Sequence, residues 1–299
     1  MSYDDFTGVS HISYPSYAET LSENLYAYLN WSFLKIGGFS NIRRSQYSYG
    51  QDLASLRDTG DHITWESPRR GWVWESGVYQ VEPIPISGVW VNGVLNRSGF
   101  QVNYREGQII FDTAKSGTIE LEYSHRLYDV YQIDKDQWFY EIIYGDWVST
   151  YDNFTSVGSG AFDVLAKHRV NLPFIGIEIV PRRDFEPLQL GGGQTVTQTV
   201  QFYVVGTNNW QVQSAVDYIS FQNDKYFKMF NLKTIQESGA QTYNYNGTLK
   251  NRNTYKYLVD NFYYKNFRTK NTQVESISTF PLYITSVRMD IESDFHELP

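Results

Sequence analysis

The clearest hydrophobic pattern lies near the start of the chain, in the segment SYAETLSENLYAYLNWSFLKIGG. Its apolar side chains recur at spacings of three, four and seven, the period of one helix face, at Leu21, Leu25, Tyr28, Leu29, Phe33 and Ile36. Ser16 and Glu19 have the spacing of a capping box, and Gly37-Gly38 can supply the left-handed turn that ends a helix. The pattern predicts a helix over about residues 17 to 36. Apolar side chains off the main stripe predict contacts on more than one side of this helix, at Tyr26, Trp31 and Leu34.

From Trp72 onward the period changes to two, which is typical of strands with one buried face. In GVWVNGVL, the pair Asn92-Gly93 readily takes the positive φ angles of a type I′ turn and predicts a tight hairpin. Three more strands are predicted, separated by glycine-bearing breaks, over Phe100 to Tyr104, Gln108 to Phe111 and Thr118 to Tyr123. The segment therefore indicates a small antiparallel sheet whose turns are too short to carry catalytic machinery.

A polar break follows in STYDNFTSVGSG and predicts a domain boundary near residue 155. Beyond it we interpret AFDVLAKH as a short helix, and LPFIGIEIVP and TVTQTVQFYVVG as strands on either side of the polar tip at Gly191, Gly192 and Gly193. The segment NNWQVQSAVDYISFQ has apolar residues at helical spacing, and Asn208 or Asn209 can cap it. Alternation in PLYITSVRMDIESDF predicts a long final strand with one polar face.

Together these elements predict an α+β fold with an N-terminal amphipathic helix, an antiparallel β-rich segment and a C-terminal α+β domain. Three parts are expected along the chain: a helical segment over 1–70, a β-rich domain over 71–150 and an α+β domain over 156–299. The pattern does not decide the secondary structure of residues 39–70, 127–148 and 226–270.

Composition narrows the classes of function. The chain of 299 residues contains 25 Tyr, 18 Phe and 8 Trp, which suit half-buried sheets and protein interfaces equally, so both interpretations stay open. The net charge is -8 and the pairs Arg43-Arg44, Arg69-Arg70 and Arg182-Arg183 are isolated, which argues against a continuous nucleic-acid-binding surface. Because there is no cysteine, the fold cannot depend on disulfides or thiolate metal sites.

The polar start MSYDDFTGVS does not have the pattern of a signal peptide, and no run of apolar residues has the length of a membrane span. We therefore expect a protein that folds in a cytoplasm and does not bind a membrane.

The sequence contains no recognisable catalytic constellation. Its five histidines are scattered, without the spacing of a helical zinc site. The polar tip lacks the Lys-Ser/Thr of a phosphate loop. Two groups of carboxylates are candidates for chemistry: a calcium loop at Asp129, Asp134 and Asp136, and a pair of glycosidase acids among Asp290, Glu292 and Asp294. The first group lacks the sequence pattern of a calcium loop. The second group is better explained as the solvent-exposed face of a strand. We therefore expect neither enzyme activity nor a bound cofactor or metal.

The block GVYQVEPIPISGVWVNGVLNRSGFQVNYREGQIIFDTAKSGTIELEYSHRLYDVY resembles a pattern of structural proteins in tailed-bacteriophage virions. In those proteins an "isgVwVnG" hairpin is followed by "y.vdy..G.I.Fd" and "G.v.veY". The matching positions are Val89, Val91, Gly93, Val102, Tyr104, Gly107, Ile109, Phe111, Gly117, Ile119 and Tyr123. In element order alone, the second half resembles tail-terminator and neck proteins, in which a long hairpin and a helix pack into a hexameric ring.

The resemblance implies a non-enzymatic structural protein of the phage neck or tail, either a head-tail connector or a tail-terminator-like ring subunit. Its C-terminal part would form a closed ring, of six or twelve copies, that contacts neighbouring virion proteins. It would join the virion in the host cytoplasm, and a non-specific contact with DNA in the ring lumen stays open. The residues expected at subunit contacts are Tyr26, Trp31, Gly191, Gly192, Gly193, Tyr243, Tyr245 and Gly247.

Two other functions stay open. An adhesion or carbohydrate-binding module could stack sugar rings on exposed aromatic side chains, for which Trp72, Trp74 and Trp90 are candidates. A carboxylate-based hydrolase would use the acidic residues of the final strand.

Overall fold

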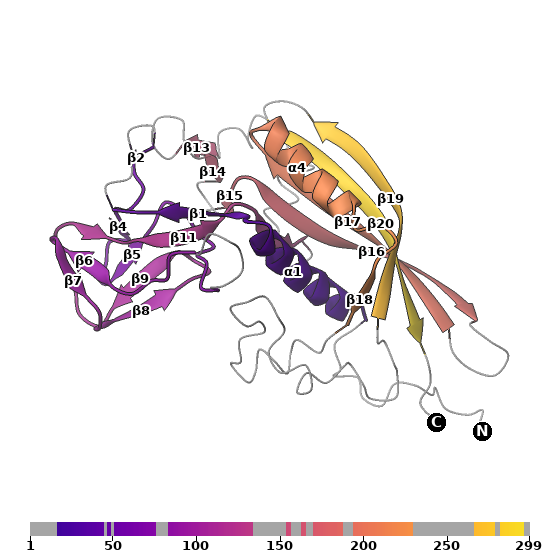
Figure 1. Cartoon of the computed structure of the whole chain (residues 1–299), viewed down its shortest axis with the longest axis horizontal. Coiled ribbons are helices and arrows are strands. Elements are labelled where there is room, and N and C mark those ends of the chain that lie inside the picture. Colours follow the sequence, from indigo (N-terminus) through magenta and orange to yellow (C-terminus); the bar gives the residue numbers. More distant parts are fainter. Residues whose placement is uncertain are drawn as a thin grey trace, which may run out of the picture.

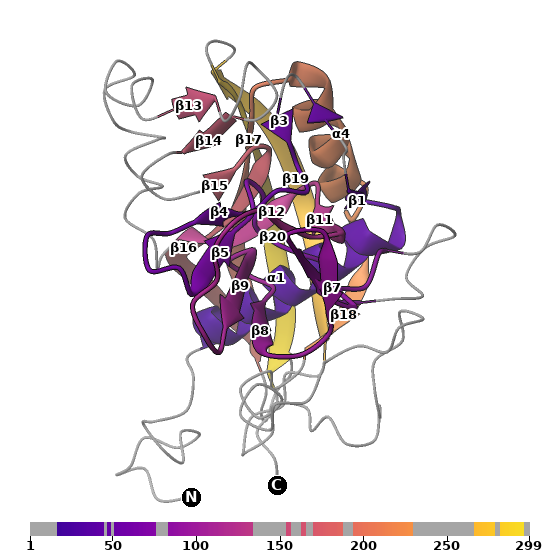
Figure 2. The same ribbon diagram turned by 90° about the vertical axis from the view of Figure 1, so that its left-hand side faces the viewer.

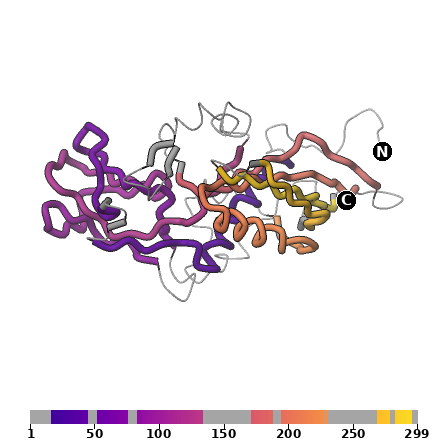
Figure 3. The backbone as a smooth tube through the Cα atoms, turned by 90° about the horizontal axis from the view of Figure 1, so that it is seen from above, coloured from indigo at the N-terminus to yellow at the C-terminus, as the bar shows by residue number. Residues whose placement is uncertain are grey.

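The computed structural model describes residues 17–44, 47–48, 51–75, 83–133, 154–156, 163–165, 170–187, 194–229, 266–278 and 282–295. Within these ranges the chain has two α-helices and mostly antiparallel β-sheets, so it is an α+β protein rich in β structure (Figure 1). A large sheet with both helices lies on one side, and a lobe of short strands lies on the other (Figure 1). Viewed from above, the described chain is elongated, with the short strands at one end and the tips of the long strands at the other (Figure 3).

The large sheet has six strands in the order β12 (Asp129–Gln132), β16 (Phe174–Pro187), β17 (Gln194–Gly206), β20 (Tyr283–Phe295), β19 (Asn266–Ser278) and β18 (Tyr226–Lys228). All neighbours are antiparallel except β12 and β16, which are parallel. The strands β16 and β17 form the predicted long hairpin, and β20 is the predicted final strand.

Both helices cover one face of this sheet. Helix α1 (Tyr17–Lys35) is followed by Gly37, whose φ of 83° is the predicted left-handed stop. Helix α4 (Asn209–Ser220) is capped by Asn208, whose side chain accepts a hydrogen bond of 2.9 Å from the Trp210 amide, as predicted. Their apolar faces and that of the sheet form the main core, which includes Leu21, Leu25, Phe33, Val212, Val216, Ile219, Phe202, Val287 and Met289. Each such side chain contributes about 1.5–3 kcal/mol by burial.

The opposite face of the sheet is buried only at one end, by a smaller cluster of Ile133, Leu172, Phe174, Tyr203, Val205, Leu282 and Ile284. Further along β20 this face carries Arg288, which is exposed, and then Asp290 and Glu292, which are half-buried. The predicted polar face of the final strand is therefore present beyond Ser286, whereas Ile284 at its start is fully buried.

The second unit, which we call the β lobe, comprises residues 39–126. Two of its sheets are strand pairs: β1 (Phe39–Ile42) with β11 (Tyr123–Arg126), and β2 (Tyr47–Ser48) with β3 (Gln51–Asp52). A four-stranded sheet has the order β4 (Arg57–Asp58), β5 (Thr64–Glu66), β9 (Gln108–Phe111) and β8 (Phe100–Asn103). A three-stranded sheet has the order β10 (Ile119–Glu120), β6 (Val89–Val91) and β7 (Val94–Asn96). They enclose a separate core that includes Ile42, Trp65, Trp72, Val89, Ile109, Leu121 and Tyr123. Figure 2 shows this lobe in front of the large sheet.

Several local predictions are confirmed. Asn92 and Gly93 have φ of 50° and 80° and join β6 to β7, as expected for a type I′ hairpin. Strands β8 and β9 lie where the alternation predicted them. The strand predicted over Thr118 to Tyr123 is instead divided, because β10 pairs with β6 while β11 pairs with β1.

The short helix predicted over AFDVLAKH is wrong. Its residues Asp163–Leu165 form strand β14, which lies between β13 (Phe154–Ser156) and β15 (Val170–Asn171). Pairing on both edges satisfies the backbone groups that a helix would have satisfied internally, and it overrides the weak local pattern.

The cores also divide the chain differently from the predicted boundaries. Helix α1 belongs to the core of the large sheet, and residues 39–70 contribute to the core of the β lobe. Strand β12, expected in the 71–150 domain, is an edge strand of the large sheet. The chain thus passes from one unit to the other between Lys35 and Phe39 and again between Arg126 and Asp129.

Candidate functional site: a polar pocket between the β lobe and the large sheet

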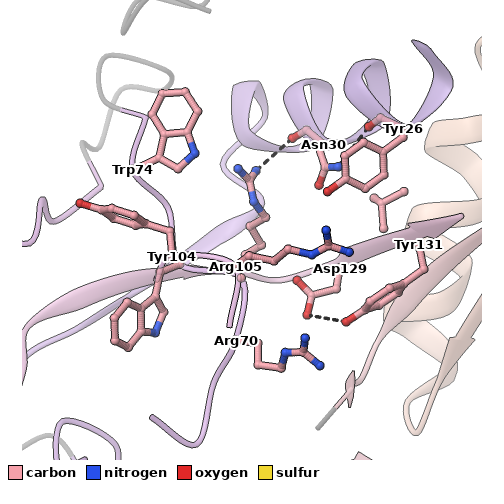
Figure 4. A pocket seen from close by; sticks show the side chains of 12 residues that line it. Tyr26, Asn30, Arg70, Trp74, Tyr104, Arg105, Asp129 and Tyr131 are labelled. Atoms are coloured by element: carbon pink, nitrogen blue, oxygen red, sulfur yellow. Dashed lines mark hydrogen bonds between the residues drawn. The ribbon is translucent and has the colours of Figure 1, made fainter. Parts of the chain in front are cut away.

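A cavity with polar walls lies where the two units meet. It has a volume of about 140 Å³ and is lined by α1, the 70–74 segment, the β8–β9 turn, the end of β11 and strand β12 (Figure 4). The lining residues are Tyr26, Asn30, Arg70, Gly71, Trp72, Trp74, Tyr104, Arg105, Arg126, Asp129, Val130 and Tyr131. We call it the junction pocket.

Backbone hydrogen bonds fix the wall formed by residues 70–72. The Gly71 amide donates to the Arg105 carbonyl at 3.0 Å, and the Gly71 carbonyl accepts from the Arg126 amide at 2.9 Å. Gly71 has a φ of 64°, and a Cβ at this position would lie 2.4 Å from Oδ1 of Asp129. A glycine is therefore needed both for the backbone angle and for the close approach of the Asp129 carboxyl group.

Three guanidinium groups line the pocket, and two of them are already paired. Arg70 forms an ion pair of 2.5 Å with Glu106. Arg126 pairs with Glu75 at 2.7 Å, and it also donates to the Asn30 carbonyl of α1 at 3.4 Å, so it links the β lobe to the helix. Arg105 is exposed and makes no ion pair with any described residue.

Asp129 is the buried acid of the site. Its Oδ2 accepts hydrogen bonds from Nδ2 of Asn171 at 3.1 Å and, more weakly, from the Tyr131 hydroxyl at 3.5 Å (Figure 4). Burial raises the pKa of Asp129, against the opposing effects of Arg126, Arg70, Asn171 and Arg69. The carboxyl group is thus desolvated although cations lie nearby.

A second buried titratable group, His125, lies beside the pocket in β11. It is 4 % exposed, and its Nδ1–H donates to the Arg126 carbonyl at 2.9 Å. Burial, reinforced by the positive charge of Arg69, lowers the pKa of His125 to about 3. His125 is therefore neutral in the folded protein throughout the physiological range.

The burial of His125 predicts a loss of stability at acidic pH. Its folded pKa lies below its usual value of 6.5, so the unfolded chain takes up a proton first and stability falls as the pH drops below about 6.5. At pH 5 the expected loss relative to pH 8 is about 2 kcal/mol. Urea unfolding of wild type and His125→Asn across this range measures it, since asparagine keeps a donor without titrating.

His125→Asn should flatten the slope of stability against pH between pH 5 and pH 8. Equal slopes in wild type and His125→Asn would contradict the assignment, whatever the absolute stability of the variant.

The residues expected at subunit contacts have different surroundings. Tyr26 is half-buried and lines the junction pocket. Trp31 is only 7 % exposed because it packs with Leu34 and Val73. Trp31 must therefore be reassigned from a subunit contact to the core of its own chain. The other expected contacts, Gly191, Gly192, Gly193, Tyr243, Tyr245 and Gly247, lie outside the described residues.

The candidate aromatic platform is not assembled. Trp72 is 1 % exposed and stacks obliquely on Tyr123, while the ring of Trp90 is covered by Arg44 at 5.1 Å. Of the three tryptophans, only Trp74 presents a half-buried ring to the junction pocket. Trp72 therefore cannot offer its face to a sugar.

The acidic face of β20 is engaged in local contacts. Asp290 accepts hydrogen bonds from Thr199 at 2.9 Å and Asn271 at 3.0 Å, and Glu292 pairs with Lys270. Asp294 accepts a hydrogen bond from Thr195 at 3.2 Å. Of the proposed calcium ligands, Asp129 lies in the junction pocket, and Asp134 and Asp136 are outside the described residues.

Within the described ranges, no three His, Asp or Glu side chains come together as metal ligands would. Neither described helix is both long and apolar enough to cross a bilayer. Comparison with protein-family models and with curated proteins gave no match.

Chemically, the junction pocket offers hydrogen-bond donors, one carboxyl group and aromatic walls, which suit the binding of a small polar molecule. From the sequence alone, Asp129 is a candidate calcium ligand and Arg69-Arg70 is an isolated basic pair, so neither predicts this pocket. The one local signal was Gly71, which follows that pair immediately.

Proposed function

We propose that the protein is a non-enzymatic structural subunit of a tailed-phage virion, located in the neck or tail and assembled as a closed ring of six or twelve copies. The proposal combines the resemblance of the β lobe to virion proteins with the arrangement of the large sheet. The order β16, β17, α4, β18, β19 and β20, in which a helix follows a long hairpin and further strands follow the helix, is consistent with a tail-terminator-like domain.

One observation carries this proposal. The far end of the β16–β17 hairpin, which we call the arm, projects beyond both helices (Figure 1). Residues 181–187 of β16 are all exposed, although their pairing with β17 continues to Pro187 and Gln194. Phe185 on this arm is 57 % exposed. A paired hairpin end that carries an exposed aromatic side chain is suited to contact a neighbouring subunit.

Repeated contacts between an arm and a different surface of the next copy are heterologous, and they close with cyclic symmetry or continue as a filament. Helix α4 offers exposed aromatic side chains for such a surface, since Trp210 is 75 % and Phe221 is 73 % exposed. A ring built this way would also join neighbouring virion proteins through its two end faces.

The expected result is a ring of six or twelve copies, measured by light scattering after size-exclusion chromatography and by negative-stain microscopy. Phe185→Asp should dissociate it, because a desolvated charge in the contact costs several kcal/mol. Val94→Asp is the matched control, since Val94 is 65 % exposed at the β6–β7 turn of the other unit.

A monomer at all concentrations, also when mixed with neck and tail proteins, would contradict the proposal. If Phe185→Asp and Val94→Asp dissociate the ring equally, the arm does not form the subunit contact, and that contact lies elsewhere on the protein.

A further inference from the structure

We propose that the junction pocket binds a neutral hydroxylated ring of the monosaccharide class. This inference goes beyond the structural role proposed above and does not depend on ring assembly. It follows from the charge balance, the hydrogen-bonding groups and the aromatic walls of the pocket.

The charge balance favours a neutral ligand. Glu106 and Glu75 already neutralise Arg70 and Arg126, at 2.5 and 2.7 Å. The remaining charged side chains of the lining are Arg105 and Asp129, one of each sign. A dianion such as phosphate would place two negative charges next to a buried carboxyl group, and a cation would face the guanidinium group of Arg105. A neutral ligand that carries hydrogen-bonding groups avoids both costs.

The available hydrogen-bonding groups call for a ligand that both donates and accepts. Oδ2 of Asp129 is occupied by Asn171 and Tyr131, whereas Oδ1 accepts no hydrogen bond from a described residue. Each hydroxyl of a sugar is one donor and an acceptor, so adjacent hydroxyls can donate to the carboxyl oxygen while accepting from Arg105.

Aromatic side chains and size complete the match. Trp74 and Tyr104 are half-buried and flank the pocket on the side away from Asp129 and Tyr131 (Figure 4). The apolar C–H face of a sugar ring packs on such aromatic faces. A volume of about 140 Å³ leaves room for one ring at most and excludes an extended chain.

The test is saturation-transfer-difference NMR on the full chain, with glucose, galactose, mannose and N-acetylglucosamine as separate probes at millimolar concentration. Acetate and inorganic phosphate serve as ionic probes. At least one sugar should bind, and Arg105→Gln should weaken it about fivefold to tenfold, because one hydrogen bond to a charged group is lost. Arg97→Gln, an exposed arginine of the same lobe that does not line the pocket, should leave binding unchanged.

Asp129→Asn and Trp74→Ala should also weaken sugar binding. Circular dichroism checks that both variants are folded. Because Arg105 is exposed, its variant keeps the test decisive even if Asp129→Asn fails to fold. No signal from any of the four sugars would overturn the proposal. Preferential binding of acetate or phosphate, or sugar binding that resists all three variants, would overturn it as well. Each result is independent of whether the protein forms a ring.

Discussion

Gly107→Ala is expected to destabilise the protein by about 3–5 kcal/mol. Gly107 has a φ of 63° in the β8–β9 turn, and a Cβ there would lie 2.3 Å from the Arg69 carbonyl oxygen. The obstacle is backbone, so no rotamer change relieves it. The turn is also held in place, because the Ser67 amide donates to the Gly107 carbonyl at 2.9 Å. The turn and the 67–71 segment must therefore separate.

Gly93→Ala is the matched control. Gly93 has a φ of 80° in the β6–β7 turn, but a Cβ there would contact nothing within 4 Å. It should cost only the backbone penalty of the left-handed region, about 1–2 kcal/mol. Urea unfolding at neutral pH compares the two variants. Equal losses would show that the backbone angle alone matters at Gly107 and that the turn is not held against Arg69.

Local signals in the sequence were sufficient for elements whose backbone is determined within a few residues. Asn92-Gly93 specifies its own turn, and Asn208 caps α4 through a bond to an amide two residues away. Alternation identified β20 because one of its faces meets both helices while much of the other is polar. In each case the deciding contact is either local or repeated along one stripe.

Contacts between distant segments explain what the sequence did not predict. Residues 163–165 are a strand only because two other segments pair with them, and β12 is fixed by parallel pairing with β16, which begins at Phe174. The off-stripe position of Trp31 correctly indicated a second contact surface on α1. It could not indicate that Val73 of the same chain occupies that surface.

The junction pocket could not be predicted from the sequence either, because it also depends on contacts between distant segments. Its walls come from residues near 26–30, 70–74, 104–105 and 126–131, and only the docking of the two units brings them together. The ion pair between Arg126 and Glu75 joins residues 51 positions apart. Single arginines and aspartates have no periodicity that would identify such a meeting point.

Breaking the ion pair between Arg126 and Glu75 is expected to cause the second large loss of stability. The side chains of Arg126 and Glu75 are 14 % and 7 % exposed. Arg126→Met should cost about 3–5 kcal/mol, because Glu75 would stay buried without its cation. It would also remove the hydrogen bond to the Asn30 carbonyl, which links the β lobe to α1. The free energy of unfolding at pH 7, from urea denaturation, measures the loss.

The double variant Arg126→Met with Glu75→Leu should recover most of that loss, because replacing both partners leaves no buried charge. Arg268→Met is the control for an exposed pair. The side chains of Arg268 and Asp224 are 35 % and 60 % exposed, so Arg268→Met should destabilise the protein far less than Arg126→Met. If the double variant is as unstable as Arg126→Met alone, the stranded charge is not the cause. The stabilising element at the junction would then be the hydrogen bond from Arg126 to α1, and both units would depend on it.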